Sequence, residues 1–202
     1  YRTTGSGSYD TIGSAVKSID GVEAVFIREN PTSTTDADGV PPYSFETIVY
    51  GGLDSIIAET LWKVKPISKK AHGTTTVSVK DFNGYTKQVS FTRPIEKYIF
   101  IDVRYTPYTE ENMAAGAIDL AKAAILRYAA DNISINTDII ANRFMGSVYS
   151  ASTGFGDITI TVAATASPTT IPSYPAEYNE VITVSDSEIA SFALDRMTFT
   201  QV

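Results

Sequence analysis

Cysteine is absent from this chain of 202 residues, and histidine occurs once, at position 72. The absence of cysteine excludes disulfide bonds and thiolate metal sites. It does not locate the protein, because a chain without cysteine suits an oxidising and a reducing compartment equally. His72 lies in the sequence AHGTT, where a lone loop histidine is more often a solvated side chain than a base. The serines therefore lack an evident partner for nucleophilic catalysis.

Long apolar runs and basic clusters are missing too. No run approaches the roughly 20 residues that a membrane-spanning helix needs. The net charge is −7, and the basic residues never cluster beyond Lys69–Lys70. We therefore expect neither a membrane nor a nucleic-acid partner. The chain begins at Tyr1 without a methionine or a basic-then-apolar leader, so we expect it to be a piece of a longer protein.

The hydrophobic pattern predicts an α+β fold of two small domains, at residues 1–95 and 96–202. Each is expected to be a short mixed or antiparallel sheet with helices packed on one face. In the first domain we expect, in chain order, a helix that is capped by Ser8 and stops at Gly21, a strand at Val22–Ile27 that is covered on both faces, a strand at Phe45–Tyr50 and a helix over Leu53–Val64.

The stretch TTVSVKDFNGYTKQVSF predicts a hairpin whose register can be argued. A two-residue turn at Asn83–Gly84 would set apolar residues opposite polar ones. A three-residue loop at 82–84 instead pairs Val77 with Val89, and a slip of one residue would swap the two faces. We therefore predict the three-residue loop, with Asp81 opening a type I turn and Gly84 at positive φ.

In the second domain we expect two helices between strands. The predicted elements are a strand at Tyr98–Tyr105, a long alanine-rich helix capped by Thr109 with Glu110 and Glu111 in its first turn, a helix from Asn136 that carries Ile140, Phe144 and Val148, an alternating strand at 157–165, an extended connection at 167–178, a short turn at Ser185–Glu188 and a closing strand at 197–202.

Residues 29–46, ENPTSTTDADGVPPYSFE, form an unusually long connection between two predicted strands, which is typical of a functional or a disordered loop. Its prolines and its DADG stretch favour a loop folded on itself. We interpret it as a candidate subunit-contact loop; the alternative is an exposed connection without a partner. The candidate contact residues are Asn30, Pro31, Asp36, Asp38, Gly39, Pro41 and Pro42.

Asp36 and Asp38 are also the best metal candidates, because TDADG resembles the start of a calcium loop. The ligand set is incomplete, however. No third ligand follows at the next odd position, and Thr47 stands where such a loop carries a glutamate. Glycine-rich phosphate-binding motifs are absent as well. We expect no metal, cofactor or catalytic residue.

A series of short motifs runs in order through residues 5–95: a helix followed by GVxxV, then ENPT, DADG, PP, SFE, VYGG, IAE with Trp62, KP, GTT with Val77 and Val79, and FTRP. This series resembles the baseplate J-like protein family of contractile-tailed phages and related prophage particles. The second half is similar in its pattern of elements only. The stretch Pro66–His72 is more basic than the family pattern there, which leaves particular partner contacts open.

The resemblance implies a non-enzymatic structural component of the baseplate wedge, in its carboxy-terminal part. Its implied partners are other copies of itself and a neighbouring wedge protein around the central hub. The implied location is the tail baseplate of the virion, and the host cytoplasm during assembly. A surface-binding module for a carbohydrate or receptor, using exposed aromatics among the twelve tyrosines, is the alternative. A tail hydrolase is a third hypothesis. It is disfavoured because the sequence shows no histidine with an evident catalytic partner.

Overall fold

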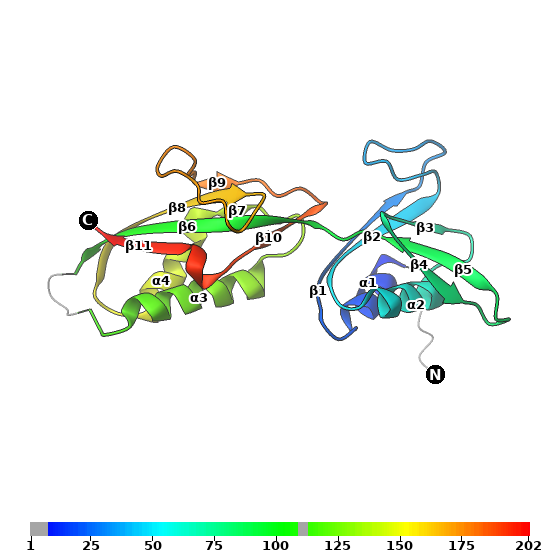
Figure 1. Ribbon diagram of the computed structural model, residues 1–202, viewed down its shortest axis with the longest axis horizontal. Coiled ribbons are helices and arrows are strands. Elements are labelled where there is room, and N and C mark those ends of the chain that lie inside the picture. The colour runs from blue at the N-terminus through cyan, green and yellow to red at the C-terminus, as the bar shows by residue number, and fades with distance from the viewer. Residues whose placement is uncertain (1–7, 109–112) are drawn as a thin grey trace. The chain divides into compact units, whose positions relative to one another are not determined.

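The computed structural model describes residues 8–108 and 113–202 (Figure 1). The fold class is α+β, as predicted: α-helices combine with several small mixed and antiparallel sheets. The chain divides into two compact units, one ending at Pro94 and the other beginning at Ile95. Among the described residues, no helix is long and apolar enough to cross a membrane. Thr109, Glu110 and Glu111, the expected helix start, lie outside the described residues.

The first unit combines two helices with a three-stranded sheet and a hairpin. Its elements are α1 (Tyr9–Lys17), β1 (Val22–Asn30), β2 (Ser44–Gly51), α2 (Asp54–Val64), β3 (Lys70–His72), β4 (Thr75–Lys80) and β5 (Thr86–Phe91). Strand β2 is central in the sheet, antiparallel to β1 and parallel to β3. Just after β5, Thr92 exchanges backbone hydrogen bonds with β2 at Thr47 and Val49, so the hairpin is joined to the same sheet.

The core of this unit lies between the helices and one face of the strands. Ser8 caps α1 as predicted, since its hydroxyl accepts a hydrogen bond from the N–H of Thr11 at 3.2 Å. The buried side chains come from both helices, from β1 and β2 and from the hairpin: Ile12, Val16, Val22, Phe45, Val49, Ile57, Ala58, Leu61, Val79, Val89 and Phe91.

Some details of the first unit differ from expectation. Residues 22–27 were expected to be covered on both faces, but β1 is an edge strand and its residues 25–29 are only half-buried. The central strand β2 is the fully covered one. Helix α1 ends at Lys17, before Gly21. Leu53 and Ile56 are exposed, so the buried stripe of α2 is narrower than predicted.

His72 lies in the short strand β3 and is half-buried, whereas the sequence suggested a loop. The sequence gives little sign of this strand, because KAH has neither alternation nor β-branched residues. Its pairing with β2 depends on tertiary structure.

The hairpin register is confirmed. Val77 lies opposite Val89 and Thr75 opposite Phe91, and Gly84 has φ +83°. The N–H of Gly84 donates to the carbonyl oxygen of Asp81 at 2.9 Å, which closes the predicted turn.

Two of the short sequence motifs, VYGG and FTRP, meet in space through one arginine. The guanidinium of Arg93 donates hydrogen bonds to the carbonyl oxygens of Val49, Gly51 and Gly52 and to the carboxylate of Asp54. It therefore fixes the turn that leads from β2 into α2. A guanidinium suits this place because its donors lie in a fixed plane and bond several acceptors at once.

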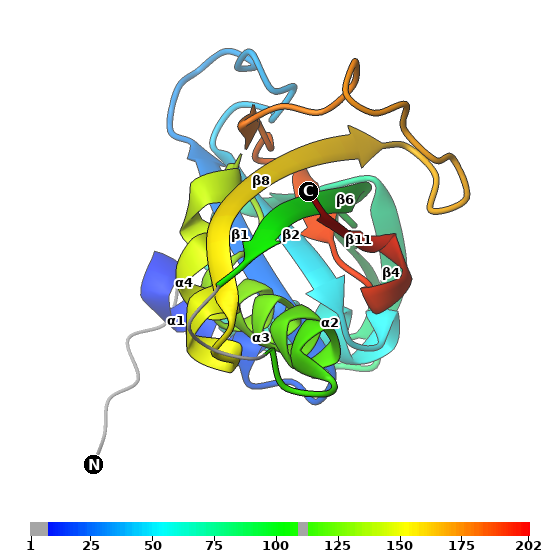
Figure 2. The same cartoon turned by 90° about the vertical axis from the view of Figure 1, so that its left-hand side faces the viewer.

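The second unit is organised around one long strand (Figure 2). Its elements are β6 (Ile95–Pro107), α3 (Ala117–Asn132), β7 (Ile139–Ile140), the 3-10 helix η1 (Ala141–Phe144), α4 (Met145–Ala151), β8 (Phe155–Thr165), β9 (Val181–Ile182), β10 (Glu188–Ser191), the 3-10 helix η2 (Leu194–Arg196) and β11 (Met197–Gln201). Strand β8 pairs antiparallel with β6, while β10 and β11 pair parallel with successive parts of β6. Helices α3 and α4 share one apolar core with this sheet.

The start of the long helix was predicted wrongly. Helix α3 begins at Ala117, after Gly116 at φ +82°, whereas Met113 and Ala114 were expected inside the helix. A residue in the left-handed conformation cannot be part of a right-handed helix, so Gly116 sets the start. The buried stripe of α3 is Ala117, Ala121, Ile125 and Ala129.

The prediction of a helix from Asn136 is also wrong. Asn136 has φ +62°, and Ile139–Ile140 form β7, which pairs with β9. Helical structure begins only at Ala141 and then runs through η1 and α4 to Ala151. Phe144 and Val148 are buried as expected.

The remaining predictions for the second unit hold in part. In β8, Ile158, Ile160 and Val162 are buried while Thr159 is exposed, as predicted, but the alternation ends there because Ala163 is buried as well. Residues 167–178 contain neither helix nor strand, but hydrogen-bonded turns form at 167–170 and 173–178, so the connection is not extended as predicted. The N–H of Ser185 donates to a carboxylate oxygen of Glu188 at 2.9 Å in the predicted turn, and β11 closes the chain.

Candidate functional site

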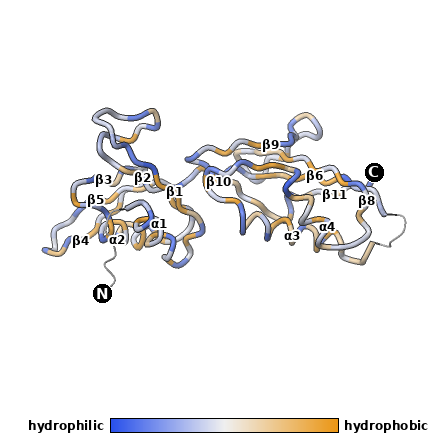
Figure 3. The backbone as a smooth tube through the Cα atoms, turned by 180° about the vertical axis from the view of Figure 1, so that it is seen from behind, coloured by the Kyte–Doolittle hydropathy of each residue, from blue (hydrophilic) through white to orange (hydrophobic). Residues whose placement is uncertain are grey.

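The long loop between β1 and β2, residues 31–43, is folded on itself. It extends beyond the ends of these strands (Figure 1). Most of its residues have hydrophilic colours in Figure 3. Most of its residues are exposed, but Val40 is completely buried and anchors the loop from inside.

Asn30, the last residue of β1, organises the interior of the loop. Its side-chain amide nitrogen donates to the carbonyl oxygens of Thr34 and Val40, each at 2.7 Å. Its side-chain oxygen accepts from the N–H and the hydroxyl of Thr32, at 2.9 and 2.6 Å. Asn30 is 1% exposed. The donors and the acceptor of this buried amide are thus all hydrogen-bonded, and the bonds hold the two sides of the loop together.

The DADG stretch closes the tip of the loop. Oδ1 of Asp36 accepts from the N–H groups of Asp38 and Val40, at 3.0 and 2.8 Å. Gly39 has φ +82° and donates its N–H to the carbonyl oxygen of Asp36 at 3.2 Å. This is the local turn chemistry for which aspartate and glycine are favoured.

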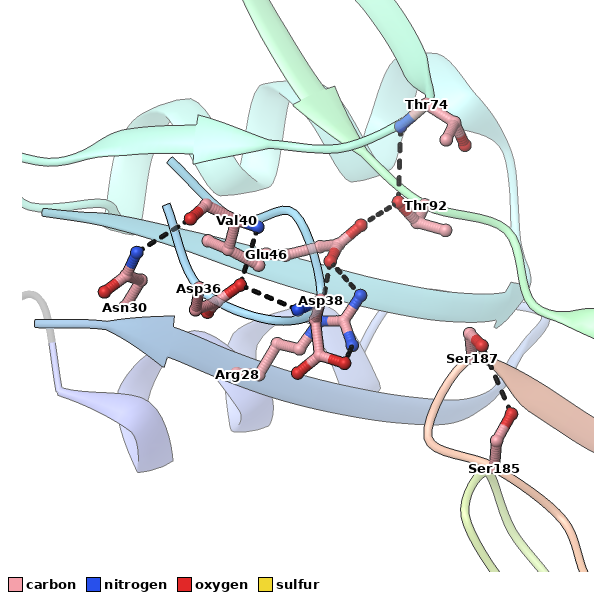
Figure 4. A network of polar contacts seen from close by, with 10 residues as sticks. All are labelled: Arg28, Asn30, Asp36, Asp38, Val40, Glu46, Thr74, Thr92, Ser185 and Ser187. Atoms are coloured by element: carbon pink, nitrogen blue, oxygen red, sulfur yellow. Dashed lines mark hydrogen bonds and ion pairs between the residues drawn. The ribbon is translucent and has the colours of Figure 1, made fainter. Parts of the chain in front are cut away.

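A chain of polar contacts ties the loop to the sheet (Figure 4). Arg28 on β1 lies 3.4 Å from the carboxylate of Asp38 and 2.7 Å from that of Glu46 on β2. Thr92 donates its hydroxyl to Glu46 and accepts from the N–H of Thr74 at 3.2 Å. The network therefore runs from the exposed loop, through the ion pair of the half-buried Arg28 with the buried Glu46, to the hairpin.

The acids of the loop have structural partners. Asp36 bonds the backbone of its own turn, and Asp38 and Glu46 face Arg28. Within residues 8–108 and 113–202, no three histidine, aspartate or glutamate side chains are grouped so as to hold a metal ion. The arrangement stabilises a loop conformation, and it does not resemble an acid–base pair or a ligand set.

The candidate contact residues divide by exposure. Pro31, Asp38, Gly39 and Pro42 are exposed, and Asp36 and Pro41 are half-buried. Asn30 lies inside the loop, so it supports the loop conformation and is not part of the candidate contact surface.

Sequence reasoning missed Tyr43 and Arg28. Tyr43 closes the loop with φ +52°, and this residue is 57% exposed. Its signal was an aromatic residue directly after two prolines. Arg28 lies opposite Glu46 in the β1–β2 ladder, a cross-strand pair of opposite charge that appears once the register is known.

A small pocket of about 140 Å³ lies near the base of the loop, in the same unit. Ile12, Ile27, Phe45 and Pro66 form its apolar walls, and Tyr9, Glu29 and Lys69 complete its lining. Glu29 and Lys69 form an ion pair. Burial raises the pKa of Tyr9, as expected for a ring held against this surface.

No protein-family model matches the chain, and a search of curated proteins finds no relative that matches it.

Proposed function

We propose that this chain is a structural component of a contractile phage tail baseplate wedge. It acts through protein–protein contacts during baseplate assembly around the hub, and the loop of residues 31–43 is one of its contact surfaces. The partners are other copies of the chain or a neighbouring wedge protein. The ordered series of motifs over residues 5–95 supports the wedge assignment.

The observation that carries the contact role is the internal bonding of the loop. A hairpin connection needs only two to five residues, and residues 31–43 span more than twice that length. A connection without a function has no need of the buried amide of Asn30 or the turn around Asp36. Because the loop is already ordered, it loses little conformational entropy when a partner binds.

The outward surface of the loop has little net charge. It presents Pro31, Ser33, Thr35, Ala37 and Pro42, with the Tyr43 ring at its end, and its exposed acid, Asp38, faces Arg28. Tyrosine is enriched at the centres of protein interfaces, where charged residues are depleted. This composition suits a protein partner better than a phosphate or a metal ion.

The test changes only outward side chains. The double variant Thr35→Arg/Ala37→Arg is expressed together with the other tail proteins, and complete baseplates are counted by electron microscopy. We expect a strong loss of complete baseplates with an unchanged melting temperature, because a buried contact would gain two unpaired charges. The control is Ala176→Arg, an exposed alanine in the second unit. Wild-type yields for the double variant would exclude the loop as a contact.

A carbohydrate- or receptor-binding surface is the second candidate. Tyr43 and Tyr85 favour it, since these residues are 57% and 68% exposed and tyrosine faces pack well on apolar faces of sugars. A glycan screen of the purified chain decides: the wedge function predicts no binding, whereas binding that Tyr43→Ala or Tyr85→Ala abolishes would support the second candidate.

A further inference from the structure

Strand β1 leaves one edge of the three-stranded sheet open (Figure 1). It pairs with β2 on one side, and within the described residues no strand pairs with it on the other. This edge is protected at one end only. The register shifts between Val22 and Ala24, and Nζ of Lys17 donates to the carbonyl oxygen of Glu23. From there to Asn30, β1 has no bulge, proline or lysine, which are features that commonly protect exposed edges.

The direction of the backbone groups of β1 follows from the pairing of β2. Thr92 donates its N–H to the carbonyl oxygen of Thr47 and accepts from the N–H of Val49, each at 2.9 Å. Both of these β2 residues therefore point their backbone groups away from β1. Ile48, between them, points its groups toward β1 and lies opposite Phe26. Because the direction alternates along a strand, the residues of β1 that point their N–H and C=O groups to the open edge are Val25, Ile27 and Glu29.

A groove runs along this edge on the side of α1. An open hollow of about 420 Å³ is lined by Val25 and Ile27 from β1 and by Gly13 from α1, among others. The pocket of about 140 Å³ shares Tyr9 and Ile27 with this hollow and continues it to Glu29. Val25 and Ile27 pack against the core of the first unit, so their side chains lie on the helix side of the sheet. The groove therefore offers room for side chains directly beside the open edge.

Gly13 keeps the α1 wall of this groove low. It lies inside α1, where glycine is less favourable than alanine because it loses more backbone freedom on folding. A Cβ atom at this position would lie 3.6 Å from Cδ1 of Ile27, which is an ordinary van der Waals contact. Packing against the described residues therefore does not require glycine, and what the missing side chain provides is space beside the edge.

We propose that an extended segment of another protein adds to β1 as a further strand of this sheet. The backbone groups of an extended polypeptide recur at the same two-residue interval as those of Val25, Ile27 and Glu29, so such a segment can bond all of them. Its alternate side chains lie over the groove, where β-branched residues fit a half-buried strand position. The proposal goes beyond the proposed function, because it depends neither on the wedge assignment nor on the loop at 31–43.

Charge favours a segment with basic ends over a second copy of this chain. Three acids and two lysines border the groove and the edge: Asp10, Glu23, Glu29, Lys17 and Lys69. Lys69 forms an ion pair with Glu29, whereas within the described residues Asp10 and Glu23 have no such pair. Lysines at the ends of the segment supply the missing positive charge, while a second copy repeats the same acids.

Amide hydrogen exchange of the isotope-labelled chain, read residue by residue by NMR, tests the proposal. In the free chain the amides of Val25 and Ile27 should exchange at least about tenfold faster than that of Phe26, which is bonded to β2. The probe is a blocked peptide of three threonine–valine repeats between two lysines, added up to about 1 mM. We expect saturable binding that slows exchange at least about tenfold at Val25, Ile27 and Glu29. Exchange at Phe26 should not change.

The variant Gly13→Leu fills the groove from the α1 side. It should weaken binding of the lysine peptide at least about tenfold without lowering the melting temperature, because leucine replaces glycine inside a helix. The matched control is Gly146→Leu, the same change at an exposed glycine of α4 with open space around it, and it should bind like the wild type. A peptide with glutamates in place of both lysines should bind more weakly than the lysine peptide.

Any of several results would overturn the proposal: no binding of the lysine peptide at about 1 mM, binding without slower exchange at Val25 and Ile27, equal binding of the glutamate peptide, or an unchanged affinity of Gly13→Leu. So would slower exchange at these amides when the chain is concentrated without peptide, since a second copy would then occupy the edge. The loop variant Thr35→Arg/Ala37→Arg leaves β1 intact and should bind the peptide normally. Failure of this proposal can therefore be distinguished from failure of the proposed function.

Discussion

Oε2 of Glu46 lies 2.7 Å from both Nε and Nη2 of Arg28, on the strand directly opposite. Glu46 is 3% exposed, and its other carboxylate oxygen accepts from the hydroxyl of Thr92. The pair therefore joins β1 to β2 next to the point where the long loop leaves the sheet. Because Arg28 also faces Asp38, the same guanidinium connects the loop to the core.

Breaking this pair should be costly. Arg28→Ala leaves the buried carboxylate of Glu46 without its counter-charge, and we expect a loss of about 3–5 kcal/mol in the free energy of unfolding. Urea denaturation measures the change. The double variant Arg28→Met/Glu46→Gln should recover part of the loss, since it removes both charges.

A matched control for this prediction is Arg127→Ala. Arg127 pairs with Asp131 on α3 at 3.8 Å, with side chains that are 85% and 66% exposed. Removing that pair should change stability by no more than about 0.5 kcal/mol. Similar losses for Arg28→Ala and Arg127→Ala would show that burial of the Glu46 pair contributes nothing.

Gly51 and Gly84 distinguish two physical reasons why a turn can require glycine. Both have positive φ, +79° and +83°, a conformation that costs other residues about 1–2 kcal/mol. A side chain at Gly51 would also overlap the carbonyl oxygen of Gly21, whereas open space surrounds Gly84. We expect Gly51→Ala to destabilise the chain by at least about 1 kcal/mol more than Gly84→Ala, because overpacking adds to the strain.

Thermal unfolding followed by circular dichroism measures both variants. Equal shifts in melting temperature would mean that the backbone near Gly21 relaxes freely and that the close approach of these two turns has no role.

The hairpin could be predicted from sequence because its determinants are local. The alternation of Val77 and Val79 and the turn chemistry of Asp81 and Gly84 act within one short stretch. Strand β3 could not be predicted, since Lys70–His72 becomes a strand only through its pairing with β2. The start of α3 could not be predicted either. It is set by the left-handed conformation of Gly116, which lies in a stretch whose composition otherwise favours a helix.

Only part of the candidate site could be predicted from the sequence. The length of the loop and its DADG turn were visible in the sequence. The role of Asn30 was not visible, because asparagine is common in turns for local reasons. The sequence does not reveal that this side chain is buried and donates to the carbonyl oxygen of Val40. The Arg28–Glu46 pair needed the register of β1 and β2, which the long loop between them conceals.

Glu188 should make the stability of the chain depend on acid. Burial raises the pKa of its carboxyl, but hydrogen bonds from Lys97 and from Ser185, together with the charge of Lys97, outweigh this and leave the pKa lowered. The Nζ of Lys97 lies 2.9 Å from the carboxylate. A carboxyl whose pKa is lower in the folded state contributes stability above its unfolded pKa, and this contribution is lost as the pH falls through the folded pKa.

The variant Glu188→Gln tests the direction of this effect. It should be less stable than the wild type at about pH 7, and the difference should shrink as the pH falls below the ordinary carboxyl value of 4.5. Urea unfolding over a pH series measures both proteins. Glu180→Gln, an exposed acid a few residues earlier, is the control and should follow the wild type throughout. The difference in the free energy of unfolding between Glu188→Gln and the wild type could instead stay constant down to about pH 3. Glu188 would then contribute through its shape and hydrogen bonds, and its ionised carboxylate would not stabilise the turn before β10.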